Sequence, residues 1–169
     1  MTDQSFHELF IDELRDLYDA EQQITRALPG VIEAVSNDDL RKALEDHLEL
    51  TSGHVERLDR IFADLGESAT GKSCKGMQGL LKEGEEAIEE HSGGVVRDAL
   101  IISGAQRIEH YEISGYGTAR TWADELGYDE AVDLLDETLD EEAAADEKLT
   151  SIATGGLIAE GVNQQAAAR

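Results

Sequence analysis

Acidic residues and one histidine occupy helix positions that apolar side chains normally fill. Over long stretches of the chain, apolar residues recur every three to four positions, as on the buried face of an amphipathic helix. These apolar stripes are interrupted by one histidine and five carboxylates: Glu21, His54, Glu109, Glu112, Glu142 and Asp146. A buried, unpaired carboxylate is costly, so five of them need a common explanation. Carboxylate oxygens and imidazole nitrogens are ligands for iron and manganese, and the pattern therefore predicts a metal site.

The distances of these residues from two predicted turns place them at a common height. In an antiparallel helix pair, residues equally far from the connecting turn lie side by side. With a turn near residue 37, Glu21 is level with His54. With a second turn near residues 127–128, Glu112 is level with Ala143, which is next to Glu142, and Glu109 is level with Asp146. We expect these layers to meet at mid-bundle around a dinuclear iron or manganese centre.

Four long apolar stripes predict the helices that position these residues, at about 3–35, 38–65, 95–126 and 129–153. The connections within the first and second pairs are short, so each pair forms an antiparallel hairpin. The long segment between the pairs carries its own amphipathic stretch, at about 76–90. The predicted fold is all-α, a ferritin-like four-helix bundle with a short helix in the crossover between helices 2 and 3. Residues 1–154 form this domain, and residues 155–169 form a loose C-terminal tail.

The charge balance excludes several classes of partner. Of 169 residues, 38 are acidic and 14 are Lys or Arg, which gives a formal net charge of −24. Such a chain is repelled by nucleic acids and by anionic lipids, so we expect neither a nucleic acid nor a membrane as partner. No apolar run is long enough to span a bilayer. The start of the chain lacks a signal-peptide pattern, and Cys74 is the single cysteine, so we expect a cytoplasmic protein.

The acidity has two interpretations. Acidic residues spread along the helix faces are typical of a halophilic protein, because high ionic strength screens their mutual repulsion. The alternative is an ordinary acidic helical protein.

Three other residues near these positions have interpretations that need no metal. His47 lies two turns from the level of Glu21, and we interpret it as a hydrogen-bonded core histidine. Glu49 falls on the solvent face. Tyr116 lies one turn after Glu112, and we interpret it as a core aromatic residue, with support of a ligand side chain as the alternative. The competing hypothesis for the whole set is that the acids face solvent or a water-filled crevice and bind no metal.

Five ordered segments resemble the YciE/YciF family of ferritin-like bacterial and archaeal stress proteins. They cover residues 13–28 (ELRDLYDAEQQITRAL), 47–58 (HLELTSGHVERL), 74–84, 108–118 and 134–153. The resemblance implies a bundle fold, a homodimer and a dinuclear metal site related to those of rubrerythrins and manganese catalases.

The ferritin-like ligand pattern transfers to this chain only in part. By resemblance, it gives Glu21, Glu109, Glu112 and Glu142 as ligands. The Glu-x-x-His of the second helix appears as Thr51-x-x-His54, without its glutamate. In the fourth helix, Ala145 stands where histidine would be, and Asp146 is the candidate substitute. One firmly held metal and one loosely held metal is therefore an alternative to a complete pair.

Three functions follow from these features. The first is a redox enzyme that acts on a small oxidant, peroxide or dioxygen. The second is a metal-sequestering protein without turnover, and the third is a purely structural stress protein. Metal content separates the third from the others, and turnover with peroxide separates the first from the second.

Overall fold

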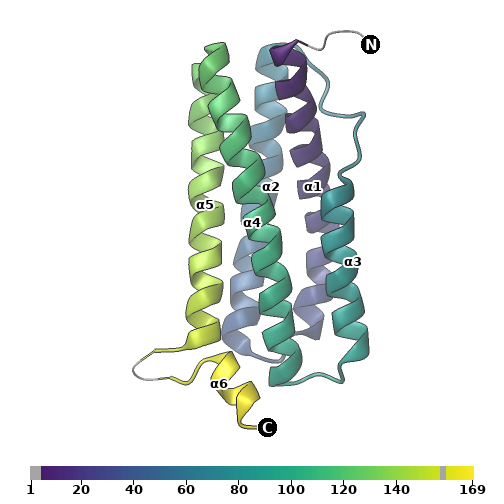
Figure 1. Ribbon diagram of the computed structural model, residues 1–169, viewed down its shortest axis with the longest axis vertical. Coiled ribbons are helices and arrows are strands. Elements are labelled where there is room, and N and C mark those ends of the chain that lie inside the picture. The colour runs from purple at the N-terminus through teal and green to yellow at the C-terminus, as the bar shows by residue number, and fades with distance from the viewer. Residues whose placement is uncertain (1–4, 157–158) are drawn as a thin grey trace.

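Four long helices form a bundle in the computed structural model, which describes residues 5–156 and 159–169. They are α1 (Phe6–Ala34), α2 (Asp38–Leu65), α4 (Val95–Leu126) and α5 (Asp129–Thr154). Two shorter helices, α3 (Lys75–Glu90) and α6 (Val162–Ala167), pack against this bundle (Figure 1). The described ranges contain no strand beyond one isolated bridge, so the all-α prediction is confirmed.

Short turns join α1 to α2 and α4 to α5, and each pair is an antiparallel hairpin (Figure 1). Asn37 caps α2, with its side chain accepting a hydrogen bond from the backbone N–H of Leu40 at 2.9 Å. Gly127 ends α4 in the left-handed conformation, with φ of 73°, which glycine adopts without steric cost. Contacts of α1 with α4 and of α2 with α5 then close the bundle around one interior.

The interior consists of two apolar clusters with a polar layer between them. One cluster lies toward the α1–α2 turn and includes Ile24, Leu44 and Ile101. The other lies toward the α4–α5 turn and includes Leu14 and Leu58. On all four long helices the apolar stripe passes from one cluster to the other through buried polar residues. The polar layer is therefore shielded from water at both ends of the bundle.

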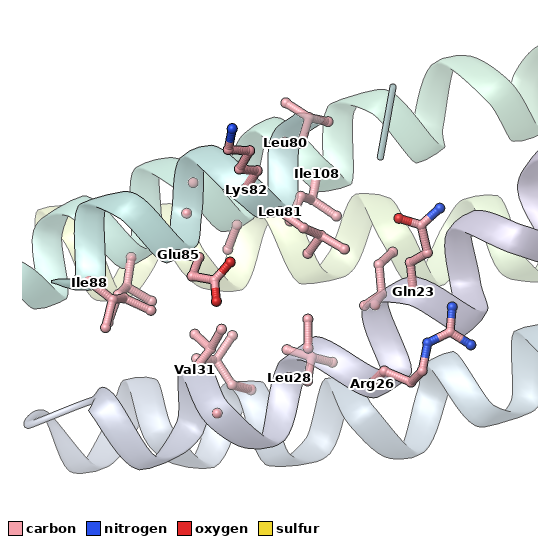
Figure 2. A pocket seen from close by; sticks show the side chains of 18 of the residues that line it. Gln23, Arg26, Leu28, Val31, Leu80, Leu81, Lys82, Glu85, Ile88 and Ile108 are labelled. Carbon is pink, nitrogen blue, oxygen red and sulfur yellow. The ribbon is translucent and has the colours of Figure 1, made fainter. Parts of the chain in front are cut away.

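Helix α3 covers α1 and α4 on the outside of the bundle. The thiol of Cys74, at its N-cap, lies 3.0 Å from the hydroxyl of Tyr111, which donates a hydrogen bond to Asp16 at 3.0 Å. Cys74 is fully buried, and burial raises the pKa of its thiol, so it is a structural rather than a reactive cysteine. Below this anchor, α1, α3 and α4 enclose a cavity of about 740 Å³ (Figure 2).

The C-terminal residues differ from the predicted loose tail. Gly161 precedes α6, and Val162 at its start is buried in the apolar cluster together with Leu149 and Ala153. Gly155 has a φ of 69°, and a side chain there would collide with the backbone of Gly161. This turn brings α6 back against α4 and α5. A single buried valine in an otherwise polar and alanine-rich segment gives no periodic signal, which is why the pattern missed this helix.

Charged side chains cover the outer faces of the long helices. Arg120 on α4 pairs with Asp136 on α5 at 3.0 Å, and Arg60 on α2 pairs with Glu130 on α5. Within the described residues, none of the helices has the length and apolar character needed to cross a membrane.

Candidate metal centre

The polar layer contains six buried side chains that metal ions commonly use as ligands. All four long helices contribute, and no member is more than 6% exposed. The members are Glu21 on α1, His47 and His54 on α2, Glu109 and Glu112 on α4, and Glu142 on α5. Each lies on the stripe that faces the interior, so packing of the apolar neighbours fixes these side chains inside.

Glu21, His54 and Glu142 form the first group. The Nδ1 atom of His54 lies 3.0 Å from Oε1 of Glu142 and 3.2 Å from Oε1 of Glu21. Each of the three residues offers one ligand atom, and these atoms lie within 4.8 Å of one another. The convergence of one imidazole and two carboxylates from α1, α2 and α5 is suited to a transition metal.

His47, Glu109, Glu112 and Glu142 form the second group, by the same distance criterion. The Nε2 atom of His47 lies 3.7 Å from Oε1 of Glu109. Glu142 belongs to both groups, and its two oxygens allow one carboxylate to serve two metal ions. The two groups together therefore could hold a pair of ions with Glu142 between them.

Many of the ligand-type atoms in this layer lack a hydrogen-bond partner. Within the described ranges, no hydrogen bond reaches the buried atoms Oε1 and Oε2 of Glu112 or Oε2 of Glu21, Glu109 and Glu142. The same holds for Nδ1 of His47, whereas Nδ1 of His54 and Oε1 of Glu142 lie 3.0 Å apart without the geometry of a hydrogen bond. Buried polar atoms are normally satisfied, because each unpaired one costs about 1–3 kcal/mol. A concentration of such atoms around one point is the pattern expected of a site that binds a cation.

The electrostatics of the layer agree with this interpretation. Burial, and then the neighbouring Glu142, raise the pKa of Glu109 to about 11, and burial also raises the pKa of Glu21 and of Glu112. Burial alone would lower the pKa of His54, but Glu142 and Glu21 outweigh it and raise that pKa to about 10. Without a cation, the layer must hold protons. Two divalent ions would instead balance the charge of four glutamates.

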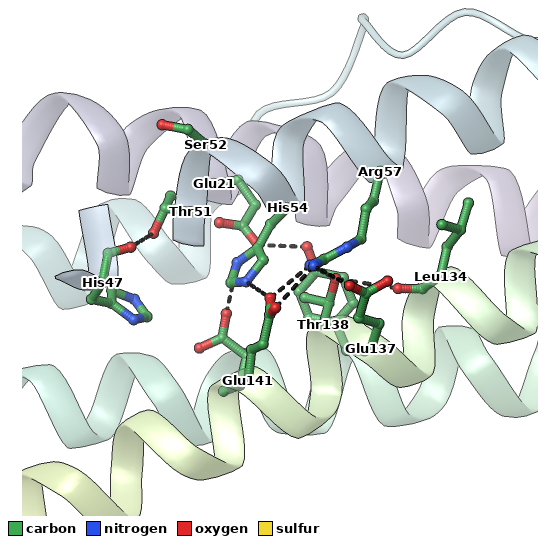
Figure 3. Close-up of polar contacts among 12 residues, drawn as sticks. Glu21, His47, Thr51, Ser52, His54, Arg57, Leu134, Glu137, Thr138 and Glu141 are labelled. Atoms are coloured by element: carbon green, nitrogen blue, oxygen red, sulfur yellow. Dashed lines mark hydrogen bonds and ion pairs between the residues drawn. The ribbon is translucent and has the colours of Figure 1, made fainter. Parts of the chain in front are cut away.

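A third carboxylate, that of Glu141, contacts the other ring nitrogen of His54 (Figure 3). The Nε2 atom of His54 lies 3.0 Å from Oε2 of Glu141, and Arg57 donates hydrogen bonds to both oxygens of that carboxylate, at 2.7 and 2.9 Å. Arg57 also donates to Thr138 at 3.1 Å. A carboxylate that accepts the second N–H of a histidine is a common support for metal-binding histidines, because it fixes the tautomer and the ring orientation.

Tyr116 touches the layer from the other side. Its side chain is fully buried, and its hydroxyl donates a 2.5 Å hydrogen bond to Oε1 of Glu21. The predicted core position of Tyr116 is confirmed, and the alternative, support of a candidate ligand, is present as well through its contact with Glu21. Burial and then Glu21 raise the pKa of the Tyr116 phenol, so it keeps its proton.

The structure brings together five of the six residues that the sequence indicated, and it leaves out Asp146. Asp146 is partly exposed and accepts a hydrogen bond from Gln106 at 2.9 Å, and its other oxygen lies 3.5 Å from His110. Residues four apart on a helix differ by about 40° in direction, and Asp146 follows Glu142 by four. Because aspartate is also shorter than glutamate, its carboxylate lies outside both groups.

His47 is the converse case: it was not predicted to be a ligand, and the structure places it in the second ligand group. The sequence suggested a hydrogen-bonded core histidine, but its Nδ1 has no partner and the residue faces Glu109. Burial lowers the pKa of His47, so its imidazole is neutral, as a metal ligand requires. The seven-residue spacing of His47 and His54 places them two turns apart on one face of the helix, and this spacing could have identified His47 as a second candidate ligand. Glu141 and Arg57 were also missed, because both look like ordinary surface charges in the sequence.

Comparisons with known proteins agree with this architecture. Residues 5–167 match the model of a family described as a domain of unknown function, DUF892. Protein YciF of Escherichia coli strain K12 is 44% identical over 154 residues, which span 90% of this chain and 93% of that protein.

Solved structures give the same result. The crystal structure of the E. coli stress protein YciF matches with a TM-score of 0.85 and covers 88% of this chain and 94% of its own. YcfI of Rhodopseudomonas palustris, named as a candidate structural protein, matches with a TM-score of 0.86 at 47% identity, over 89% of this chain and 96% of its own. The resemblance seen in the sequence is thus confirmed, and the chain belongs to the DUF892 family of helical-bundle proteins, together with the stress protein YciF.

Proposed function

We propose that this protein binds a pair of iron or manganese ions in the polar layer and uses them to react with peroxide or dioxygen. The observation that carries the proposal is the set of buried, unpartnered ligand atoms shared by two groups through Glu142. Glu21 and His54 would hold one ion, and His47, Glu109 and Glu112 the other. These donors fit the proposed ions, because imidazole and carboxylate suit iron and manganese.

The chemistry at this site would be oxidation and reduction, since paired iron or manganese ions exchange electrons with dioxygen or peroxide. The residues of the chain prepare the site for it. Arg57 and Glu141 hold the ring of His54 so that Nδ1 points inward. Tyr116 keeps a proton 2.5 Å from Glu21. The apolar clusters on both sides exclude water, which strengthens every electrostatic interaction in the layer.

The relationship to a protein named as a stress protein supports peroxide or dioxygen as the substrate. A structural role is the second candidate, and the name given to YcfI favours it. A purely structural bundle would, however, gain stability from apolar residues in place of four buried glutamates. The polar layer is therefore better explained by binding than by architecture.

Metal analysis tests the proposal. The protein should be purified without chelators, analysed for bound metal, and then titrated with Fe(II) or Mn(II) before peroxide is added. We expect two ions per chain and catalytic loss of peroxide. Metal uptake without peroxide loss would point to sequestration, and no uptake of either metal would leave the structural role.

We further propose that the protein is a homodimer, as the family resemblance implies. Sedimentation should give a dimer at micromolar concentrations in high salt, and a monomer under those conditions would contradict this.

A further inference from the structure

One side of the polar layer opens toward a cavity. The cavity of about 740 Å³ lies between α1, α3 and α4, and Figure 2 shows Leu28 and Val31 of α1 facing Leu81 and Ile88 of α3 across it. Its lining reaches His47 and Glu109, which belong to the second ligand group. Glu21, His54 and Glu142 are not part of the lining. The cavity therefore reaches the second ligand group through His47 and Glu109, and it does not reach Glu21 or His54 of the first group.

The polar atoms at the inner end of the cavity lack partners. His47 is 94% buried and Glu109 is 98% buried, given their exposures of 6% and 2%. Nδ1 of His47 and Oε2 of Glu109 make no hydrogen bond within the described residues. The rest of the wall is mostly aliphatic. This combination of apolar walls and a few convergent polar groups is typical of sites for organic ligands, which measure about 300–1,000 Å³.

The size and charge of the cavity indicate the class of ligand. Peroxide and dioxygen have two heavy atoms each and need only a small part of this volume. The lining includes two exposed cations, Arg26 on α1 and Lys82 on α3, and two exposed anions of α3, Glu85 and Glu89. These charges are thus balanced on a chain of net charge −24, whose overall field disfavours anions. A neutral molecule fits these conditions best.

We infer that this cavity binds a neutral, apolar organic molecule whose single hydrogen-bonding group reaches His47 and Glu109. The molecule is a co-substrate of the metal centre, and this assignment rests on the proposed function, whereas binding in the cavity does not require metal. The small residues of the wall keep the space open. A Cβ added at Gly104 on α4, or at Gly84 on α3, would meet no atom within 4 Å.

Binding of phenylnaphthylamine, a neutral apolar fluorophore with one N–H group, tests the inference. We expect saturable fluorescence enhancement with one probe per chain. Gly104→Leu and Gly84→Leu fill the cavity from two different helices and should each weaken binding at least tenfold. Gly117→Leu is the matched control, because Gly117 also lies on α4 with open space around it but does not line the cavity. Equal binding by Gly104→Leu and Gly117→Leu, with both folded by circular dichroism, would overturn the inference.

Two further measurements separate this inference from the proposed function. When Mn(II) is bound, its paramagnetism should broaden the NMR signals of the bound probe, most strongly at the N–H end. Probe binding without metal uptake would refute the metal centre and leave the cavity site standing. Metal uptake without probe binding would refute the cavity site and leave the metal centre standing. If a second copy of the chain covers the cavity instead, Gly104→Leu would change the sedimentation behaviour, and the wild type would not bind the probe, which contradicts the inference.

Discussion

His54 and Glu141 lie on different hairpins and meet side chain to side chain, with 3.0 Å between Nε2 and Oε2. Arg57 holds the same carboxylate, and Arg57 and His54 keep the pKa of Glu141 below its usual range against the effect of burial. With Nε2 committed to Glu141, the Nδ1 atom is left for Glu21 and Glu142. One surface-facing ion pair thereby sets the orientation of a buried ligand.

Removing Arg57 should therefore weaken metal binding without removing any ligand. For Arg57→Ala we expect a loss of about 10–100-fold in metal affinity, the usual effect of losing support behind a ligand. Competition with a calibrated chelator measures it. Arg60→Ala is the control, since Arg60 also joins α2 to α5 but pairs with the exposed Glu130. Similar affinities for both variants would show that Arg57 does not position His54.

The metal-free protein should lose stability as pH rises from about 5 to about 10. Glu109 has a pKa of about 11 and His54 a pKa of about 10 in the folded state, above the ordinary values of 4.5 and 6.5. Between these limits the folded state binds more protons than the unfolded state, so the free energy of unfolding falls with increasing pH. Urea denaturation across this pH range measures the slope. Glu109→Gln should flatten it, and a slope unchanged by that substitution would contradict the assignment.

Glu112→Leu should stabilise the metal-free protein and abolish binding of the ion assigned to the second ligand group. Both oxygens of Glu112 are buried without a hydrogen bond, and three further carboxylates, Glu21, Glu109 and Glu142, raise its pKa. Replacing it with an apolar side chain of similar volume should raise the free energy of unfolding by about 1–3 kcal/mol. Thermal denaturation in chelator, with and without subsequent metal, checks both effects. Destabilisation of the metal-free form would mean that Glu112 contributes to folding rather than to binding.

If the acidic surface is an adaptation to salt, stability should depend strongly on ionic strength. The Debye length falls from about 30 Å at 0.01 M to about 3 Å at 1 M salt, which screens the repulsion of a chain with net charge −24. We expect the melting temperature to rise by about 4 °C or more in molar KCl, equivalent to about 1–2 kcal/mol. A flat response would favour an ordinary acidic protein.

The fold and most of the polar layer could be predicted because both depend on helical periodicity. Glu21 and His54 lie nearly equally far from a short turn, so counting residues was enough to bring them together. The same counting placed Asp146 beside Glu109, but it ignores the rotation of about 40° per four residues and the length of the side chain. Those two effects turned Asp146 toward Gln106.

The remaining features depend on contacts between elements far apart in the sequence. Glu141 is next to Glu142 in sequence and looks like surface charge until α2 brings Arg57 against it. The cavity arises from how α3 lies over α1 and α4, and no periodic pattern within one helix reports it. Likewise, α6 is held by one buried valine and a tight glycine turn.

The metal content of Glu142→Ala tests the central claim most directly, because Glu142 belongs to both ligand groups. Glu49→Ala is the control, a carboxylate of the same bundle that is exposed in the structure. After loading with Fe(II) or Mn(II) and removal of unbound metal, we expect the wild type and Glu49→Ala to retain two ions per chain and Glu142→Ala to retain one or none. Equal retention by Glu142→Ala and the wild type would contradict the account.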